Sequence, residues 1–275
     1  MDHYCVMGNP VEHSRSPWIH ARFAALTGQS VDYGKLLVPL QGLAGAVCAF
    51  KRDGGRGCNV TVPFKFEAVA LATQRSQSVT LAGAANVLSF LGDAILADNT
   101  DGVGLVNDIQ RNAGFDLRGR HVLLIGAGGA ASGVLGPLLL ARPASISLVN
   151  RTRHKGELLV ARHAALAGLQ GVDLVVREFA DLKGDFDAVI NASASSLAGA
   201  SVPVSARVLK AGTLAYDMMY GASAQAFLSW AEEGGAQARD GLGMLVEQAA
   251  EAFLIWRAVR PPAQQVLAEL RSLMA

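Results

Sequence analysis

Residues 121–131 read His-Val-Leu-Leu-Ile-Gly-Ala-Gly-Gly-Ala-Ala, and this stretch decides the fold class. Its apolar run predicts a buried strand, and the glycines after it predict a tight turn into a helix. Gly126 would permit the turn, Gly128 would let a pyrophosphate approach the backbone, and Ala131 would allow close helix–strand packing. The alternative is a glycine turn that holds no ligand. We predict a dinucleotide site, with the cofactor held by Gly126, Ala127, Gly128, Gly129 and Ala130.

Strand and helix signals alternate on both sides of this stretch. The strands expected after it indicate a doubly wound Rossmann sheet and lie near residues 145–150, 173–178, 187–191 and 213–217. Those expected before it indicate an α/β domain with a mainly parallel sheet and lie near residues 3–7, 34–38 and 58–62. Helices are expected near 17–27 and 40–51. The domain change is placed at residues 98–102, and the chain from Gly241 on is expected to be helical, with a break at Pro261-Pro262.

The end of the strand at 145–150 indicates which cofactor is bound. An NAD site carries an acidic residue here, whereas this chain has Arg151-Thr152-Arg153-His154-Lys155. Arg151 can grip a 2′-phosphate, Thr152 can donate a hydrogen bond, and Lys155 can add positive charge. The alternative is a solvated basic loop. Because the run lies at the tip of this strand, we predict NADP.

The composition excludes several classes of function. The 275 residues carry a formal net charge of +1, which gives no reason to invoke nucleic acid or an anionic membrane. The three cysteines show no metal-ligand spacing, so no metal is expected. The first residues lack the pattern of a signal peptide, and no apolar run is long enough to span a membrane. We expect a cytoplasmic protein.

Three short motifs in the first half mean little one at a time. Ser14-Arg-Ser16-Pro17 reads as a turn, Asn59–Lys65 as a helix start with a surface lysine, and Asp98–Gly102 as a helix cap. In order and spacing, however, they resemble the shikimate dehydrogenase family. The resemblance extends over nearly the whole chain, through Gly8-Asn9-Pro10, Asn86, Asn99-Thr-Asp101-Gly102, Gly126–Ala130, Asn150-Arg-Thr152, Tyr216-Asp-Met218 with Tyr220, and Asp240-Gly-Leu-Gly-Met244 with Gln248.

The resemblance implies an activity and a role for each matching residue. The activity is the reversible NADPH-dependent reduction of 3-dehydroshikimate to shikimate, in the pathway to chorismate and the aromatic amino acids. Lys65 would shuttle the proton, and Asp101 would orient both Lys65 and the substrate. A lysine that acts as a base near neutral pH needs partial burial. The implied substrate contacts are Ser14, Ser16 and Tyr220 to the carboxylate, and Thr61, Asn86 and Gln248 to the ring hydroxyls. The implied further cofactor contacts are Asn150, Met218 and Gly241.

The resemblance also implies the domain organisation. Residues 1–101 with 242–275 would form the substrate-binding domain, because the C-terminal helices return to it. Residues 102–241 would form the Rossmann NADP-binding domain, across a cleft from the first. Monomer and homodimer both stay open.

Several positions depart from the family pattern, and two rival functions compete with the one implied. The departures are expected to affect cofactor affinity and fine selectivity rather than the reaction, and the main ones are Phe66, Gln77, Val87 and Ala131. One rival is a quinate/shikimate dehydrogenase that prefers NAD; Ser16 and the Arg151 loop argue against it. The other is a non-catalytic NADP-binding relative; retention of both Lys65 and Asp101 argues against that.

Overall fold

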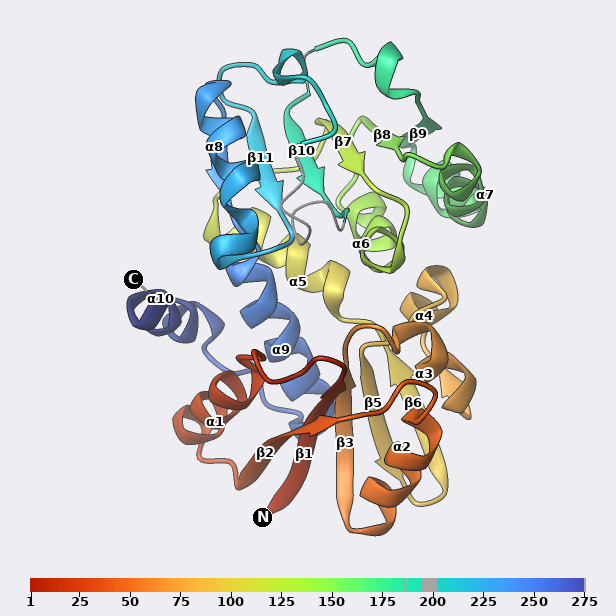
Figure 1. The fold of residues 1–275 in the computed structure, drawn as a ribbon, viewed down its shortest axis with the longest axis vertical. Helices are drawn as coiled ribbons and strands as arrows, with labels where there is room; N and C mark the ends of the chain where they lie inside the picture. The colour runs from red at the N-terminus through yellow and green to blue at the C-terminus, as the bar shows by residue number, and fades with distance from the viewer. Residues whose placement is uncertain (185, 194–201, 275) are drawn as a thin grey trace. The chain divides into compact units, whose positions relative to one another are not determined.

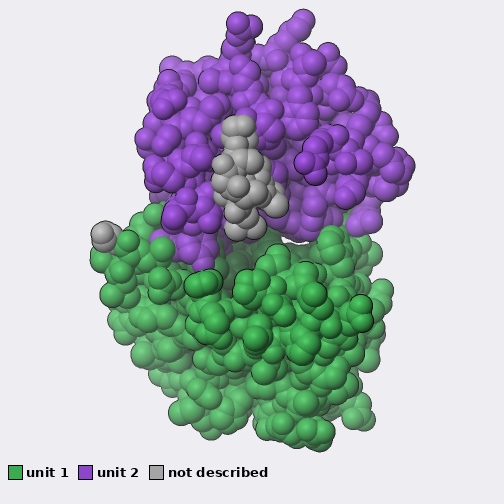
Figure 2. Space-filling model, in the orientation of Figure 1, with its two compact units in different colours: residues 1–104, 245–275 green, residues 105–244 purple. Residues whose placement is uncertain are grey.

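The computed structural model describes residues 1–184, 186–193 and 202–274. It divides into two compact units, residues 1–104 with 245–275 and residues 105–244, which are coloured separately in Figure 2. The chain passes from the first unit to the second within helix α5 (Asp101–Asn107) and returns within helix α9 (Leu242–Arg257). The two domain boundaries were expected at 101/102 and 241/242, and in the structure the units divide at 104/105 and 244/245.

The first unit contains a six-stranded sheet of mixed direction (Figure 1). Its strand order is β2-β1-β3-β5-β6-β4, in which β2, β1 and β3 are parallel and β5 runs antiparallel to both neighbours. The strands are β1 (Asp2–Gly8), β2 (Val31–Leu37), β3 (Gly55–Val60), β4 (Gln74–Arg75), β5 (Val87–Leu91) and β6 (Ala94–Asp98).

The third strand differs from its prediction. It was expected over 58–62, but it ends at Val60, and Thr61 begins a turn in which the Phe64 N–H donates to the Thr61 carbonyl. Pro63 explains the early end, because proline has no N–H to give to a strand ladder. The turn delivers Lys65 as the first residue of helix α3 (Lys65–Leu71).

The second unit is a doubly wound parallel sheet. Its order, β9-β8-β7-β10-β11-β12, is that of a Rossmann domain, so the predicted fold class is confirmed. The predicted strand over 121–125 is found with those bounds. The strands are β7 (His121–Ile125), β8 (Ser145–Val149), β9 (Asp173–Val176), β10 (Ala188–Asn191), β11 (Leu214–Asp217) and β12 (Gln237–Arg239).

Helices accompany both sheets. In the first unit they are α1 (Ser16–Thr27), α2 (Leu43–Arg52), α3, α4 (Gln77–Ala82) and α10 (Ala263–Met274). In the second unit they are α6 (Gly129–Leu140), α7 (Arg153–Gln170) and α8 (Gln225–Glu233). Within the described part of the chain, no helix is both long and apolar enough to cross a membrane.

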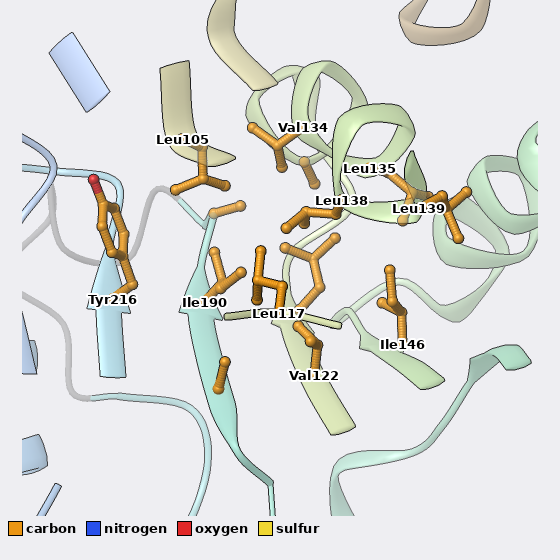
Figure 3. Close-up of a cluster of buried hydrophobic side chains, with 14 of the residues drawn as sticks. Leu105, Leu117, Val122, Val134, Leu135, Leu138, Leu139, Ile146, Ile190 and Tyr216 are labelled. Carbon is orange, nitrogen blue, oxygen red and sulfur yellow. The ribbon is translucent and has the colours of Figure 1, made fainter. Parts of the chain in front are cut away.

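Each unit has its own buried core. In the second unit, side chains of α6 pack on β7, β8 and β10, with Val122, Val134, Leu138 and Ile190 fully buried (Figure 3). In the first unit, β1 and β3 contribute Met7, Cys58 and Val60 to a separate cluster. Burial of these apolar side chains stabilises each sheet and so fixes the ends of its strands. The candidate site residues described below include polar residues at those ends.

Candidate active site

Lys65 and Asp101 form a close ion pair in the first unit. The Lys65 Nζ donates to the Asp101 Oδ2 at 2.5 Å, across 36 residues of sequence. The Asp101 side chain is 7% exposed and that of Lys65 is 22% exposed. The Lys65 side chain is therefore partly buried. The pair can hold a proton at one point and present it to a bound group.

Asn86 holds the carboxylate of this pair from the other side. Its Nδ2 donates to the Asp101 Oδ1 at 2.9 Å and lies 3.0 Å from the Thr100 Oγ1. Its Oδ1 accepts the Thr100 backbone N–H at 2.8 Å. Asn86 is buried, and these bonds tie the start of β5 to the start of α5. The two oxygens of Asp101 are thus divided between Lys65 and Asn86, which fixes the plane of the carboxylate.

Gln248 reaches the same cluster from the C-terminal helix α9. Its Oε1 lies 3.2 Å from the Asn86 Nδ2, and its backbone carbonyl accepts from the Thr100 hydroxyl at 3.0 Å. Gly104 allows this approach, because a Cβ there would lie 2.6 Å from the Gln248 backbone nitrogen. The family resemblance implied a contact of Gln248 with the ring hydroxyls of the substrate. The observed contact is with Asn86, one hydrogen bond removed from the ion pair.

Ser14 and Ser16 lie at the start of α1, and Tyr33 and Asn59, to which no role was assigned from the sequence, connect them to the ion pair. The Ser14 Oγ accepts the Ser16 N–H at 3.3 Å, and the Ser16 side chain interacts with the buried Tyr33 hydroxyl. That hydroxyl donates to the Asn59 Oδ1 at 2.6 Å, and the Asn59 Nδ2 donates to the Asn86 carbonyl at 3.1 Å. Asn59 could have been singled out as a polar residue inside an apolar strand. Tyr33 carried no such signal.

Thr61 is the first residue of the turn between β3 and α3. Its N–H donates to the Met7 carbonyl at 2.9 Å, which anchors the turn to β1. A Cβ on Gly8 would lie 2.4 Å from the Thr61 methyl carbon, so Gly8 is needed for this packing. Ser16, Thr61, Lys65, Asn86, Asp101 and Gln248 therefore all belong to the first unit, where four of them form one connected cluster.

The glycine loop of the second unit has the geometry of a dinucleotide site. Gly126 has φ +109°, which favours glycine, and a Cβ there would lie 3.0 Å from the Ala192 carbonyl oxygen. A Cβ on Gly128 would meet no described atom within 4 Å, so the backbone there is open to a ligand. Among the described residues, no side chain caps the start of α6 at Gly128. The N–H groups of its first turn suit the pyrophosphate of a dinucleotide.

The basic loop after β8 is joined to the glycine loop by Asn150. The Asn150 Oδ1 accepts the Ala127 N–H at 3.1 Å, and its Nδ2 donates to the Thr152 carbonyl at 2.8 Å. Arg151, Thr152 and Lys155 are exposed, as residues that meet a phosphate must be before it binds. Arg153 differs, because its guanidinium already pairs with Glu157 and Glu178, each at 2.7 Å.

Met218 and Gly241 meet at the ends of β11 and β12. The Gly241 N–H donates to the Met219 carbonyl at 2.8 Å, and a Cβ on Gly241 would lie 2.3 Å from the Met218 carbonyl oxygen. Tyr220 follows in the same turn and is half-buried. Tyr220 therefore lies in the second unit, whereas Ser14 and Ser16 lie in the first.

The departures from the family pattern fall in different surroundings. Phe66 is 55% exposed and Gln77 is exposed at the start of α4. Val87 pairs with Asp98 in the hairpin of β5 and β6. Ala131 is fully buried in the core beneath α6, where its small side chain suits the helix–sheet packing that was predicted for it.

Fold and site together define a two-unit dehydrogenase with a Rossmann domain. Comparison with known families agrees: residues 6–88 match the shikimate dehydrogenase substrate binding domain, residues 108–203 match shikimate/quinate 5-dehydrogenase, and residues 241–271 match the shikimate 5′-dehydrogenase C-terminal domain. The chain belongs to the shikimate dehydrogenase family, so the resemblance drawn from the sequence is confirmed.

Individual relatives resemble the chain over its full length. The shikimate dehydrogenase (NADP(+)) of Acidovorax sp. (strain JS42) is 64% identical over 274 residues, covering 100% of this chain and 97% of that protein. The crystal structure of an Ael1 enzyme from Pseudomonas putida is 42% identical with a TM-score of 0.91, covering 98% of each chain. The shikimate 5-dehydrogenase from Thermus thermophilus in complex with NADP(H) and shikimate is 27% identical with a TM-score of 0.84, covering 99% of each chain.

Proposed function

We propose that this protein catalyses the reversible NADPH-dependent reduction of 3-dehydroshikimate to shikimate. The observation that carries the proposal is the pair of Lys65 and Asp101, 2.5 Å apart and braced by Asn86. The full-length relatives that bear the name shikimate dehydrogenase (NADP(+)) support the same reaction. The enzyme is an NADP-dependent oxidoreductase that acts on a secondary alcohol, and its reaction serves the formation of chorismate and the aromatic amino acids.

The first unit binds the substrate and moves the proton. NADP, when bound, supplies the hydride chemistry at nicotinamide C4. During oxidation the Lys65 Nζ, as the neutral amine, would take the proton from the substrate hydroxyl and become the ammonium; during reduction the ammonium would return that proton to the carbonyl oxygen. Asp101 orients the ammonium through its Oδ2 and contacts the same hydroxyl, while Asn86 keeps its Oδ1 in place. Directed proton transfer of this kind contributes about 10²–10⁴-fold to a rate.

Other residues of the first unit hold the rest of the substrate. The hydroxyls of Ser14 and Ser16 donate to its carboxylate, and neutral donors suit an anion that must also leave. Thr61, Asn86 and Gln248 contact the ring hydroxyls. The family resemblance also implies a contact of Tyr220, a residue of the second unit, with the carboxylate. The chain of bonds from Ser16 through Tyr33 and Asn59 to Asn86 sets the spacing between the carboxylate end and the reacting end.

The second unit binds NADP at the carboxyl ends of its strands. Residues 126–130 would hold the pyrophosphate, and Arg151, Thr152 and Lys155 after β8 would hold the adenosine 2′-phosphate. Met218 and Gly241, at the ends of β11 and β12, lie on the other side of β7 in the strand order, so they would contact the nicotinamide half. Arg151→Gln should raise the KM for NADP⁺ about tenfold or more and leave the KM for NAD⁺ nearly unchanged, since a charge-assisted bond to phosphate is lost. Arg153→Gln is the matched control, because Glu157 and Glu178 already occupy that guanidinium.

A two-by-two initial-rate assay tests the function directly. Shikimate or quinate is paired with NADP⁺ or NAD⁺, and reduced nicotinamide is followed by absorbance. We expect turnover dominated by shikimate with NADP⁺. Comparable or faster rates with quinate or NAD⁺ would instead favour the rival function, a quinate/shikimate dehydrogenase. Nucleotide binding without turnover on any of these acids would favour a non-catalytic relative.

A variant pair tests the catalytic assignment in the same assay. Lys65→Ala should lower kcat by at least about 10²-fold because the proton loses its carrier. Lys51→Ala removes a half-buried lysine of α2 whose Nζ donates to the Asp93 carbonyl, between β5 and β6, so it should leave kcat and KM unchanged. Near-wild-type turnover by Lys65→Ala would rule out the role proposed for Lys65.

The proposal extends to the compartment. Cys5 and Cys58 are register partners on neighbouring strands, and both are free, buried thiols. A reducing compartment keeps such thiols in this form, which supports a cytoplasmic location.

The enzyme acts as a monomer or a homodimer on small molecules. Sedimentation at working concentration would distinguish the two states.

A further inference from the structure

A buried charge cluster lies in the second unit, outside every residue named so far as a substrate or cofactor contact. Asp108, fully buried, begins a π-helical turn (Asp108–Asn112) that directly follows α5. Its Oδ1 accepts from the Arg239 Nη2 at 2.5 Å and the Asn112 Nδ2 at 2.9 Å. Its Oδ2 accepts from the Arg239 Nε at 2.8 Å and the Tyr216 hydroxyl at 2.7 Å. Four donors fill the accepting capacity of the carboxylate.

The arrangement is a side-on, bidentate ion pair with a tyrosine added. The hydrogen bond to Asp108 raises the pKa of the Arg239 guanidinium, so Arg239 stays charged. Burial, together with the negative Asp108, raises the pKa of the Tyr216 hydroxyl well above its usual range, so Tyr216 stays a donor. Figure 3 shows Tyr216 at the margin of the buried aliphatic cluster, with its hydroxyl directed away from that cluster. Arg239 and Tyr216 therefore each keep one protonation state, and both remain hydrogen-bond donors to Asp108.

The two side chains that Asp108 holds are opposite each other in the sheet. Tyr216 of β11 and Arg239 of β12 are register partners on parallel strands. Two residues further along each strand direction come Met218 and Gly241, the proposed nicotinamide contacts. These two lie against each other, since a Cβ on Gly241 would lie 2.3 Å from the Met218 carbonyl oxygen. Asp108 thus fixes the spacing of the two strands directly before the turns that carry Met218 and Gly241.

The same carboxylate also fixes the start of α9. A Cβ on Gly243 would lie 1.8 Å from the Asp108 Oδ1, so only glycine lets the first turn of α9 pack here. Gly243 follows Gly241 by two residues. The turn that carries Gly241 is therefore held at both ends by Asp108, through Arg239 before it and through Gly243 after it.

We propose that Asp108, with Arg239 and Tyr216, is a positioning group for the nicotinamide half of the cofactor. It acts through the backbone of Met218 and Gly241 and touches neither the cofactor nor the substrate. The inference rests on the proposed function, because it takes these two residues as nicotinamide contacts. The inference explains why Met218 and Gly241 are placed as they are: the buried ion pair sets the distance between the two turns that would contact the nicotinamide ring.

Two ligands separate this role from a general structural one. NADP⁺ carries the nicotinamide, whereas 2′-phospho-ADP-ribose carries only the adenosine, phosphate and ribose parts that Gly126–Ala130 and Arg151 would hold. Arg239→Met should weaken NADP⁺ binding about tenfold and lower kcat about 10²-fold, since a displacement of about 1 Å has effects of that size. Its affinity for 2′-phospho-ADP-ribose should stay within about twofold of wild type. Titration calorimetry measures both dissociation constants.

A milder variant and a control complete the test. Tyr216→Phe keeps the ring and removes one donor, so it should weaken NADP⁺ binding about three- to tenfold with the same selectivity. It decides the matter if Arg239→Met does not fold. Lys210→Met breaks the ion pair of Lys210 with Asp187, which lies on the amino side of β10 and β11, and should change neither affinity. Equal weakening of both ligands, or no weakening of NADP⁺, would overturn the proposal. Wild-type turnover of shikimate is measured separately, so failure of the proposed function is recognised on its own.

Discussion

Acidification should destabilise the first unit through His20, a buried residue that takes no part in the proposed chemistry. His20 is fully buried, and its ring stacks on Tyr33 with the ring centres 4.1 Å apart. Phe23, Phe253 and Trp256 also surround it. Neither ring nitrogen has a hydrogen-bond partner of normal geometry among the described residues. Burial lowers the pKa of His20 from 6.5 to about 3, although an interaction with Asn59 partly opposes the shift.

The sign and size of the effect follow from proton linkage. Between pH 6.5 and about 3 the unfolded chain binds a proton at His20 that the folded chain does not, so stability falls as pH falls. Each unit of pKa difference is worth about 1.4 kcal/mol at full effect. From pH 7 to pH 5 the loss through His20 alone is about 2 kcal/mol, and it reaches about 4 kcal/mol at pH 3.

Urea unfolding at pH 7 and pH 5 measures this loss. Trp256 is 5.5 Å from the His20 ring and serves as the reporter of the first unit once Trp18 and Trp230 are replaced by phenylalanine. In that background, His20→Leu removes the titrating group. The variant changes the packing at both pH values, so only the difference between pH 7 and pH 5 is compared. We expect that difference to shrink by about 2 kcal/mol.

A second histidine provides the control. His154 is exposed at the start of α7, so His154→Gln should leave the pH difference as it is in the parent. An equal loss of stability in His20→Leu and its parent between pH 7 and pH 5 would refute the reasoning. It would mean that the buried ring gains a proton without cost, which contradicts its apolar surroundings.

Three further predictions concern single contacts. Gly104→Ala should lower kcat at least about tenfold and cost about 1–3 kcal/mol of stability, because its Cβ would displace the Gln248 backbone; kinetics and urea unfolding measure the two effects. Asp101→Asn should lower kcat about 10²-fold, since the amide no longer orients an ammonium, and a smaller effect on kcat than on the KM for shikimate would contradict this role. Arg22 lowers the pKa of Glu269 to about 2, so the stabilisation by this pair is present above about pH 4.5 and is lost as pH falls toward 2. The Tm difference between wild type and Glu269→Gln should therefore shrink from pH 5 to pH 3.

The parts of the fold that the sequence predicted are those set by local pattern. The β7 strand was found to the residue because its apolar run is bounded by Arg120 and by the glycine turn. The β5–β6 hairpin was not predicted, although its two-residue Gly92-Asp93 turn is a known hairpin signal. Gly92 has φ +55°, as such turns require. A search for turn residues between short apolar runs would have found it.

The site shows a second limit, which depends on sequence separation. Lys65 and Asp101 could be paired in advance only because the family resemblance brought them together. The contact of Gln248 with Asn86 spans 162 residues, and it depends on the absence of a side chain at Gly104. No periodicity encodes a contact of that kind. Tyr33 was missed for the same reason, since its hydroxyl gains meaning only from Asn59 on another strand.

The Asp108–Arg239 pair could not be predicted from local sequence pattern, and a contribution to stability does not explain why an ion pair is buried there. The partners are 131 residues apart, and Asp108 reads in the sequence as an ordinary polar position on an amphipathic helix. A buried ion pair is weak as a source of stability, because apolar residues of similar volume often match or exceed it by about 1–4 kcal/mol. What apolar packing cannot supply is direction. A carboxylate that accepts from Arg239 and Tyr216 on adjacent strands fixes those strands relative to each other, and this is the property that a cofactor contact formed by two backbone turns requires.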